Sequence, residues 1–574
     1  MPDPEPLPFT SCSLPRRAGD ALAETSGVVD PVSITLSYHQ QTKHHLDRYA
    51  QSLGYLDWAN QPNPFRTFKG AARLELPLAA DGLTTPFADF YTPLALPARP
   101  LERKNIAIFF ELALGLSAWK EFRGDRWALR CNPSSGNLHP TEGYAILPPL
   151  PHLEAGVYHF VSGHHCLERR CWLEGRAAVE LILALPPDSF LVGLSSIHWR
   201  EAWKYGERAF RYCQHDAGHA LASVRYAAAA LGWSASLLDS YSDDDVAALL
   251  GLDRAADFAD VSPQDREHPV GLVLVSASPV AARPWILPVE AVRGGQWIGK
   301  ANPLSSSHMS WELIDQVAKA TWKPVTAWSG CVDNSPLPPL FSQCRTPAAT
   351  LIRQRRSCVA LDGRTTIPAE AFYRMLDPLL PRPGVPPWDT LSWSPQLHVG
   401  IFVHRVTGLA PGLYLLERDG RIHDRMRAAL RPEFLWERPA DCPEHLRLYY
   451  LMQDDLRRTA QIVSCHQEIA ADGAFSLGMI ADFSLSIKQK GAWWYRRLFW
   501  EAGVLGQVLY LEAEAAGVRS TGIGCYFDDA FHELLGLTGN EFQDLYHFTV
   551  GGPVEDRRLM TLPAYAHLDR MNTG

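Results

Sequence analysis

The chain has 574 residues, of which 46% are hydrophobic and 20% charged, and its formal net charge is −9. This length predicts more than one sizeable core, and the negative charge gives no electrostatic reason to bind nucleic acid or an anionic membrane. No apolar run approaches the roughly 18 residues of a membrane span, and the first residues, MPDPEPLPFTSC, have neither the basic region nor the apolar core of a signal peptide, so we expect a cytoplasmic protein.

The 11 cysteines form no CxxC pair. Their scatter through helical and strand patterns predicts reduced, mostly buried thiols rather than a disulfide framework or a zinc site. The densest group, HHCLERRC at 164–171, could offer soft metal ligands, but its place after the strand-like VYHF favours the solvated edge of a hairpin. We therefore expect no bound metal.

Proline, glycine and serine divide the chain into four predicted segments. Residues 1–95 form an N-terminal extension with one helix and then aromatic, proline-rich coil, and residues 96–281 form a first domain. Residues 282–345 form a connector rich in Pro, Ser and Trp, and residues 346–574 form a second domain. The tryptophans of the connector need a surface to cover them, which favours an ordered segment over a flexible linker.

Both domains are expected to contain the same series of elements. Each has a helix, a strand, a turn, a second strand, a long apolar helix, a glycine, a short strand or loop, a helix and a final strand. The final strands are VGLVLV at 270–275 and HFTVGG at 547–552. This order predicts an α+β domain of about 200 residues, an ordinary domain size.

The two series are copies of each other. Residues 218–251 align without a gap on residues 503–536, at an offset of 285, and the sequence Gly156-Val-Tyr matches Gly412-Leu-Tyr at an offset of 256. The offsets differ by 29, so the second copy has an insertion between these anchors. The chain therefore contains a duplicated domain.

In the first copy, a turn of small polar residues precedes a strand. It reads RCNPSSGNLHPTE, at 130–142. Backbone N–H groups and short polar side chains in such a turn can approach a phosphate, a polyol or a heteroaromatic ring. On composition alone, a plain surface turn is the commoner interpretation.

The second copy has three segments that suit an anion. They read RQRRS at 353–357, TGIGC at 521–525 and DRRL at 556–559. Guanidinium forks with a serine hydroxyl suit a phosphate monoester, and glycine lets the backbone approach an anion. Each basic dipeptide by itself is more often a solvated face.

The first-copy turn, together with HWREAWKYGERAFRY at 198–212, DAGH, YHQQTKH and LDWANQP, resembles the SagB/ThcOx type of the FMN-dependent nitroreductase superfamily. The segments RQRRS, STGIG and EDRRL resemble the flavin-phosphate elements of that superfamily. The resemblance covers nearly the whole chain. It implies an α+β protein of two fused nitroreductase-like domains that form an intrachain pseudo-dimer, each with a mixed central sheet wrapped by helices and with FMN at their interface.

In that superfamily, each flavin takes the ring-side turn from one subunit and the phosphate elements from the other. Here the first copy has Leu237–Asp239 where the second has its glycines, and the second copy has Asp389–Trp393 where the first has its turn. The resemblance therefore implies one composite FMN site per chain. Its expected cofactor-binding residues are Arg130, Pro133, Ser134, Ser135, Asn137, Arg355, Arg356, Ser357, Gly522, Ile523, Gly524 and Arg558.

Lys204 and Tyr205 resemble the Lys–Tyr pair of the family's azoline oxidases, which implies that they are catalytic and assist removal of a substrate proton while hydride passes to flavin. The second copy has Trp493-Trp494-Tyr495-Arg496 in the corresponding region and no lysine. A purely structural interpretation stays open, in which Lys204 extends from a helix start and Tyr205 packs.

The sequence thus predicts an FMN-dependent oxidoreductase that dehydrogenates a small heterocyclic, amino-acid-derived or carrier- or peptide-bound substrate, with NAD(P)H as a candidate co-substrate. The alternatives are an NAD(P)H-dependent nitro- or quinone reductase, a flavin-consuming enzyme and a non-catalytic scaffold partner. Because an intrachain site needs no second subunit, both a monomer and a homodimer are compatible with the sequence.

Overall fold

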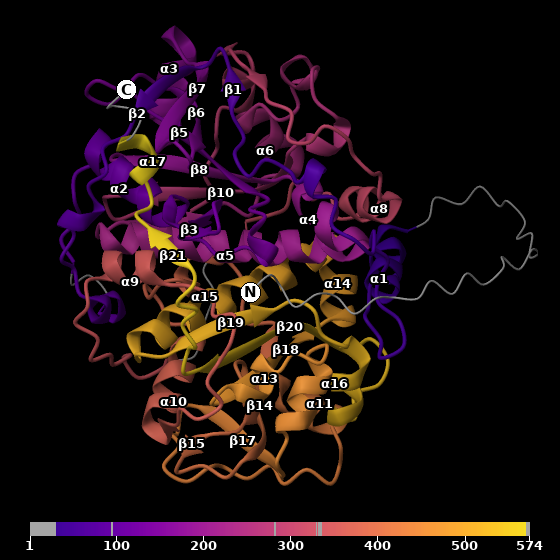
Figure 1. Cartoon of the computed structure of the whole chain (residues 1–574). Helices are drawn as coiled ribbons and strands as arrows, with labels where there is room; N and C mark the ends of the chain where they lie inside the picture. The colour runs from indigo at the N-terminus through magenta and orange to yellow at the C-terminus, as the bar shows by residue number, and fades with distance from the viewer. Residues whose placement is uncertain (1–29, 93–95, 281–282, 329, 331–335, 570–574) are drawn as a thin grey trace, which may run out of the picture.

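The computed structural model describes residues 30–92, 96–280, 283–328, 330 and 336–569. In Figure 1, the sheet of the first copy lies in the upper half and that of the second copy in the lower half, with helices α5 and α15 between them. No helix of the described ranges combines the length and hydropathy that a bilayer crossing needs.

The first copy contains the series of elements expected from the sequence. The elements are α2 (Arg103–Ala113), β3 (Leu116–Phe122), β4 (Asp125–Arg130), β5 (Thr141–Leu147), β6 (Gly156–Val161), β7 (Cys166–Trp172), α3 (Gly175–Ala184), β8 (Ser189–Ser196), α4 (His198–Tyr205), α5 (Ala209–Ala230), β9 (Ser234–Leu237), α6 (Asp243–Leu250) and β10 (His268–Ser276).

The second copy repeats this order with more helices. The elements are α9 (Ala348–Gln354), β13 (Ile367–Pro368), α10 (Ala369–Leu376), β14 (Leu397–Val403), β15 (Val406–Thr407), β16 (Gly412–Glu417), α11 (His423–Ala429), β17 (Arg447–Gln453), α12 (Arg457–Val463), α13 (Ile469–Asp472), β18 (Phe475–Asp482), α14 (Ser484–Lys490), α15 (Trp494–Ala515), β19 (Arg519–Ile523), α16 (Asp528–Leu535) and β20 (Phe542–Gly551). The predicted insertion includes α11, which lies between β16 and β17 where the first copy has a short turn.

The two central sheets have the same strand order. It runs β7-β6-β5-β8-β10-β9 in the first copy and β17-β16-β14-β18-β20-β19 in the second. The predicted α+β class is confirmed, but the described ladders of both sheets are antiparallel and not mixed. Neighbouring strands such as β5 and β6 follow one another through short connections, which antiparallel pairing permits and parallel pairing does not.

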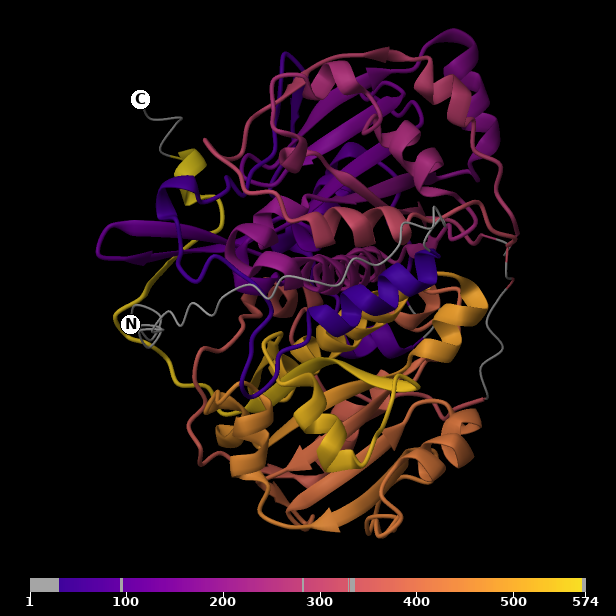
Figure 2. The ribbon, with the colours of Figure 1, turned by 90° about the vertical axis from the view of Figure 1, so that its right-hand side faces the viewer.

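Segments outside the two copies add to the sheet of the first. Strand β2 (Ala72–Glu75) and strand β11 (Gln296–Trp297) both pair with β7, so the extension and the connector cover an edge that would otherwise be open. The other elements of these segments and of the C-terminal region are α1 (Pro31–Gln41), β1 (Phe68–Lys69), α7 (Val289–Arg293), β12 (Lys300–Ala301), α8 (Glu312–Ala320), β21 (Met560–Leu562) and α17 (Ala566–Asp569). Figure 2 shows α1 lying beside the junction of the copies.

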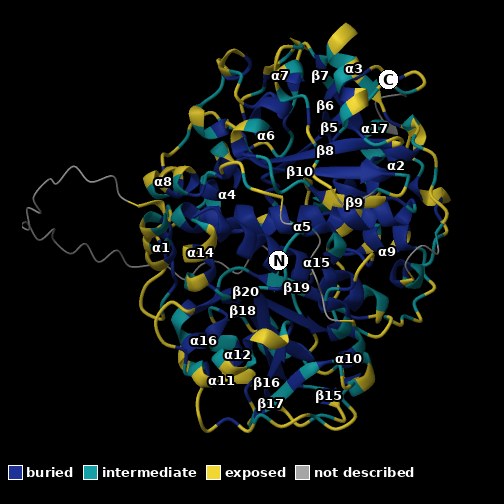
Figure 3. Cartoon of the chain, turned by 180° about the vertical axis from the view of Figure 1, so that it is seen from behind, coloured by how far each residue is buried: buried dark blue, intermediate teal, exposed yellow. Residues whose placement is uncertain are grey.

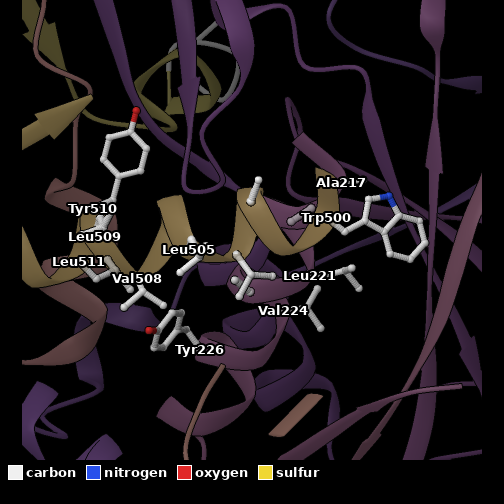
Figure 4. Packing of buried hydrophobic residues seen from close by; sticks show 14 of the residues in the cluster. Ala217, Leu221, Val224, Tyr226, Trp500, Leu505, Val508, Leu509, Tyr510 and Leu511 are labelled. Atoms are coloured by element: carbon white, nitrogen blue, oxygen red, sulfur yellow. The ribbon is translucent and has the colours of Figure 1, made fainter. Parts of the chain in front are cut away.

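Helices α5 and α15 form the centre of the molecule. Every residue of α5 is buried, and Figure 3 shows both helices in the buried interior. They cross at Gly218 and Gly503, where a methyl group would overlap the backbone of Trp500 or of His215 on the opposite helix. The crossing therefore requires the absence of a side chain at both positions. Apolar residues that pack around it include Ala217, Leu221, Val224, Trp500, Leu505 and Val508 (Figure 4).

Two buried ion pairs join the copies reciprocally. Arg211 on α5 donates to Asp528 at 2.7 Å, and Arg496 on α15 donates to Asp243 at 2.7 Å. The offset of 285 relates Arg211 to Arg496 and Asp243 to Asp528. The contact is thus isologous, as in a two-fold homodimer, although both halves belong to one chain.

Candidate functional site

The predicted ring-side turn lies at the junction of the copies, held by α5. A 3₁₀ turn at Ser135–Asn137 follows β4, and both the backbone N–H and the hydroxyl of Ser135 donate to Asp216 Oδ1, at 3.0 and 3.1 Å. Ser134 Oγ accepts from the N–H of His139 at 2.8 Å. Gly136 and Asn137 both have positive φ, 56° and 59°, a conformation that glycine and asparagine adopt most readily.

Tyr205 lies directly against this turn. A methyl group at Gly136 would come within 2.6 Å of the Tyr205 hydroxyl, and the rings of Tyr205 and Tyr212 have centroids 4.4 Å apart. Lys204 Nζ lies 5.4 Å from the centroid of the Tyr205 ring. The structure therefore brings the predicted Lys–Tyr pair to the predicted turn. Burial and the neighbouring carboxylate of Glu201 raise the pKa of Tyr205, so its hydroxyl is held as a proton donor.

Two buried acids beneath the turn were not predicted. Glu201 on α4 is fully buried, neither of its carboxylate oxygens has a hydrogen-bond partner in the described residues, and Asp216 Oδ2 also lacks one. Burial, reinforced by the charge of Asp216, raises the pKa of Glu201 far above its ordinary value. Burial raises the pKa of Asp216 to about 7, against the opposing effect of Ser134 and Ser135. Two buried acids with raised pKa values beside Tyr205 are an arrangement typical of proton transfer.

We predict that Asp216→Asn flattens the pH dependence of stability. Because folding raises the pKa of Asp216 from 3.8 to about 7, the stability that this acid contributes is fully present below 3.8 and is lost as the pH rises through about 7. The wild type should lose at most about 4 kcal/mol across that range through this group, and Asp216→Asn should not. Urea unfolding at several pH values measures the difference, with exposed Asp47→Asn as the control. Equal pH profiles for wild type and Asp216→Asn would contradict the assignment.

The predicted phosphate elements converge on one hydroxyl group. Tyr510 Oη on α15 lies 2.7 Å from Ser357 Oγ and accepts from the N–H of Gly522 at 3.1 Å. The Arg355 guanidinium lies 4.9 Å from the centroid of the Tyr510 ring and donates to the carbonyl of Arg130 in the first copy at 3.1 Å. Groups from 355–357 and from β19, far apart in sequence, thus meet beside the first copy.

The guanidinium groups of Arg355 and its neighbour Arg356 form no ion pair within 4.0 Å among the described residues, although Arg355 is buried and Arg356 is half-buried. The Glu514 carboxylate lies nearby and accepts from the backbone N–H of Arg356 at 3.4 Å. Arg356 donates to Ser117 Oγ at 3.2 Å and to the Ser117 carbonyl at 3.1 Å, across the junction of the copies. Desolvation lowers the pKa of Arg355, and lowers that of Arg356 to about 10. Buried guanidinium groups without a counter-ion are costly, so this donor set fits a phosphate group.

Two of the residues predicted to bind the cofactor have side chains that do not point into this cluster. The guanidinium of Arg130 donates to the carbonyls of Thr141 and Pro64, at 3.1 and 2.5 Å, so only its backbone reaches Arg355. The side chain of Arg558 is half exposed and donates to Asp556 at 2.8 and 2.9 Å. Asp556 is only two residues away in the sequence, so its carboxylate binds this guanidinium locally.

The remaining predicted residues have mainly structural contacts. Pro133 is buried, and Asn137 Nδ2 donates to the carbonyl of Ala128 at 2.9 Å. The side chain of Ile523 packs in the core cluster of the second copy.

An aromatic row, missed from the sequence, connects the phosphate cluster with the turn. In order, its residues are Tyr510, His219, Tyr546, His215, Tyr212 and Tyr205. The spacing of 212, 215 and 219 along a helix is the only sequence signal for it. A methyl group at Gly522 would overlap the Tyr546 hydroxyl, and one at Gly524 would overlap the Tyr212 ring. A flavin ring that approached these two glycines from that face would have to displace both tyrosines.

A cleft of about 440 Å³ lies in the second copy, where the repeat places the counterpart of the ring-side turn. Its lining includes Trp393, Arg421, Arg425, Lys490 and Trp494. On the opposing first copy, the position related to Gly524 is Asp239, whose carboxylate pairs with Arg497 at 2.6 Å. A carboxylate at that position disfavours a phosphate. No group of three or more potential metal ligands occurs in the described ranges.

Comparisons with known proteins agree with this architecture. A protein of Anabaena variabilis, described as a putative nitroreductase, superposes with a TM-score of 0.64 at 21% identity, over 91% of this chain and 99% of its own. A putative nitroreductase of Methanocaldococcus jannaschii is 26% identical over 132 residues, which is 22% of this chain and 66%, just under two thirds, of that relative. A chain of the E. coli microcin synthetase McbBCD complex, solved with truncated pro-MccB17 bound, matches 44% of this chain at a TM-score of 0.26 and 17% identity. No family model matches the chain.

The Anabaena protein is matched over nearly its full length and across both copies, so the chain has a nitroreductase fold in tandem. The resemblance noted in the sequence is confirmed at the level of the fold.

Proposed function

We propose that this chain is an FMN-dependent oxidoreductase with one composite FMN site, built from the ring-side turn of the first copy and the phosphate cluster of the second. The observation that carries the proposal is the pair Arg355 and Arg356, whose guanidinium groups are desolvated at the junction of the copies and form no ion pair within 4.0 Å among the described residues. An anionic ligand would supply the direct ion pair that neither guanidinium group has.

Each part of the chain has a role in this proposal. FMN, when bound, supplies hydride transfer. Arg355, Arg356 and the Ser357 hydroxyl would hold its phosphate, with the N–H of Gly522 released from Tyr510 for the same purpose. Ser135, fixed by Asp216, would orient the ring-side turn.

Lys204 and Tyr205 favour dehydrogenation over simple reduction. Lys204 is half-buried beside the Tyr205 ring, and the two side chains together would assist removal of a substrate proton, with the raised pKa of Tyr205 keeping its hydroxyl protonated. We therefore propose a small heterocyclic, amino-acid-derived or carrier- or peptide-bound substrate. Lys204→Ala should lower kcat about 100-fold or more for such a substrate, with FMN still bound. Full activity of Lys204→Ala with NAD(P)H and a quinone would instead support the reductase alternative.

We predict a flavin stoichiometry of one FMN per chain. This expectation is supported by Arg355 and Arg356 at the junction, and by the Asp239–Arg497 ion pair at the position that the repeat relates to Gly524. Saturation with FMN followed by gel filtration and flavin absorbance measures the ratio. A ratio near two would contradict a single composite site. Mass spectrometry of the released cofactor after aerobic reduction tests the flavin-consuming alternative, which requires that FMN be converted to another product.

One observation favours a second candidate, a non-catalytic scaffold. Tyr546 and Tyr212 cover the faces of Gly522 and Gly524 that a flavin ring would approach. A scaffold of this kind would purify colourless and would bind no FMN on titration. Tight binding of FMN at the ratio above would exclude it.

A further inference from the structure

Two cysteines 60 residues apart in sequence meet beside the candidate site. Cys465 follows α12 and Cys525 follows β19, and their sulfurs lie 2.8 Å apart as free thiols. The sequence predicts reduced, mostly buried thiols, and no CxxC spacing marks this pair. The fold thus creates a dithiol that the spacing of the cysteines does not reveal.

The backbone around both cysteines is held in this arrangement. Cys465 and His466 have φ of 54° and 59°, a left-handed conformation that non-glycine residues adopt at a cost in energy. The side-chain amide of Gln467 donates to the carbonyls of Ser464 and Cys525, both at 2.9 Å. These two hydrogen bonds connect the end of α12 to the loop after β19 and keep the sulfurs together.

The surroundings of the pair suit thiol chemistry. Both cysteines are partly accessible to solvent. The hydrogen bond between the thiols, together with the guanidinium of Arg208, lowers the pKa of Cys525 against the opposing effects of burial and Asp528. Burial and the same hydrogen bond raise the pKa of Cys465. Cys525 is therefore the more acidic thiol of the pair, and the thiolate is the nucleophilic form of cysteine.

We propose that Cys465 and Cys525 form a redox-active dithiol that is oxidised reversibly to an intramolecular disulfide by a low-molecular-weight disulfide such as oxidised glutathione. In the first step, the Cys525 thiolate attacks one sulfur of glutathione disulfide, and one glutathione leaves as a thiolate. Cys465 then gives its proton to that thiolate and attacks the Cys525 sulfur, and the second glutathione leaves and takes a proton from solvent. In total, two protein thiols lose two electrons and two protons, and one glutathione disulfide becomes two glutathione thiols.

The disulfide would act on the candidate site through the glycine before Cys525. The Gly524 carbonyl accepts from Tyr212 Oη at 3.0 Å and from Arg208 Nη2 at 3.4 Å. A bond from Cys525 to Cys465 would fix this carbonyl and its two donors relative to α12. The proposal concerns the thiols themselves and does not depend on whether FMN binds.

The test is a count of thiols in the intact, full-length protein. The native protein is incubated with excess oxidised glutathione, denatured in N-ethylmaleimide and digested for peptide mass analysis. We expect the peptides of Cys465 and Cys525 to be recovered joined, without N-ethylmaleimide, and to be separated again by dithiothreitol. Full alkylation of both cysteines after this treatment, or glutathione retained on either one in the wild type, overturns the proposal.

Variants distinguish the roles of the two sulfurs. In Cys465→Ser, the second displacement cannot occur, so Cys525 should retain glutathione as a mixed disulfide. Cys442→Ser is the matched control, because Cys442 is also half-buried but its sulfur contacts the carbonyls of Pro443 and Leu446. This control should form the Cys465–Cys525 bond as the wild type does. If Cys465→Ser does not fold, the wild-type thiol count alone still decides the proposal.

Discussion

Replacing Arg355 by glutamine should weaken FMN binding about 10- to 100-fold and leave the flavin-free chain at least as stable as the wild type. The two effects have opposite signs for one reason. Arg355 is buried with a lowered pKa, and its guanidinium forms no ion pair within 4.0 Å among the described residues. Its charge therefore destabilises the flavin-free chain but strengthens the binding of a phosphate. Isothermal titration with FMN and urea unfolding of the flavin-free chain measure the two effects.

Arg558→Gln is the matched control for Arg355→Gln. The sequence places both arginines among the phosphate ligands, but Arg558 is half exposed and bound to Asp556. Arg558→Gln should therefore change neither FMN affinity nor stability by a measurable amount. Equal losses of FMN affinity in both variants would mean that the C-terminal arginine closes over the ligand. A strong loss of stability in flavin-free Arg355→Gln would show that Arg355 is structural.

The fold was predictable from the sequence because duplication leaves a signal that needs no structure. The offset of 285 aligns α5 with α15 and β9 with β19, and the offset of 256 aligns β6 with β16. The direction of the strands was not predictable in this way. A repeat establishes that two units are alike, but the pairing of each strand depends on connections whose geometry the alignment does not contain.

The candidate site was predictable in part. The sequence indicated which segments come together, but not the directions in which their side chains point. Arg355, Ser357 and Gly522 all lie against Tyr510, whereas the guanidinium of Arg130 points away from them. Glu201 is one turn before Lys204 on α4, yet nothing in its local sequence distinguishes a buried acid from an exposed one. The meeting of Cys465 with Cys525 depends on tertiary packing alone.

The second large effect is expected at Asp528, which joins three parts of the chain. Its carboxylate accepts from Arg208 at 2.9 Å, from Arg211 at 2.7 Å and from the backbone N–H of His44 at 3.0 Å, and it is fully buried. Asp528→Asn removes the charge that both guanidinium groups face. It should lower the free energy of unfolding by about 3–5 kcal/mol, because it leaves buried charges uncompensated.

The duplication provides an internal comparison for Asp528→Asn. Asp243 occupies the related position but accepts from one guanidinium, that of Arg496 at 2.7 Å, and from the N–H of Lys323 at 2.8 Å. Asp243→Asn should therefore destabilise the chain less than Asp528→Asn. Arg208 also donates to the Gly524 carbonyl at 3.4 Å, so Asp528→Asn should weaken FMN binding as well, which Asp243→Asn should not. Equal effects of the two variants on stability would contradict this difference.

The pH dependence distinguishes loss of charge from loss of packing at Asp528. Burial alone raises the pKa of this carboxyl, but Arg208 and Arg211 outweigh burial and hold the pKa far below its ordinary value. For a depressed pKa, the stabilisation is present above the unfolded value of 3.8 and is lost as the pH falls through the folded value. The stability difference between wild type and Asp528→Asn should thus be constant near neutral pH and smaller at about pH 3. A difference that did not change with pH would arise from the altered shape of the side chain, and the carboxylate would then not be the charge that joins the N-terminal extension, α5 and the second copy.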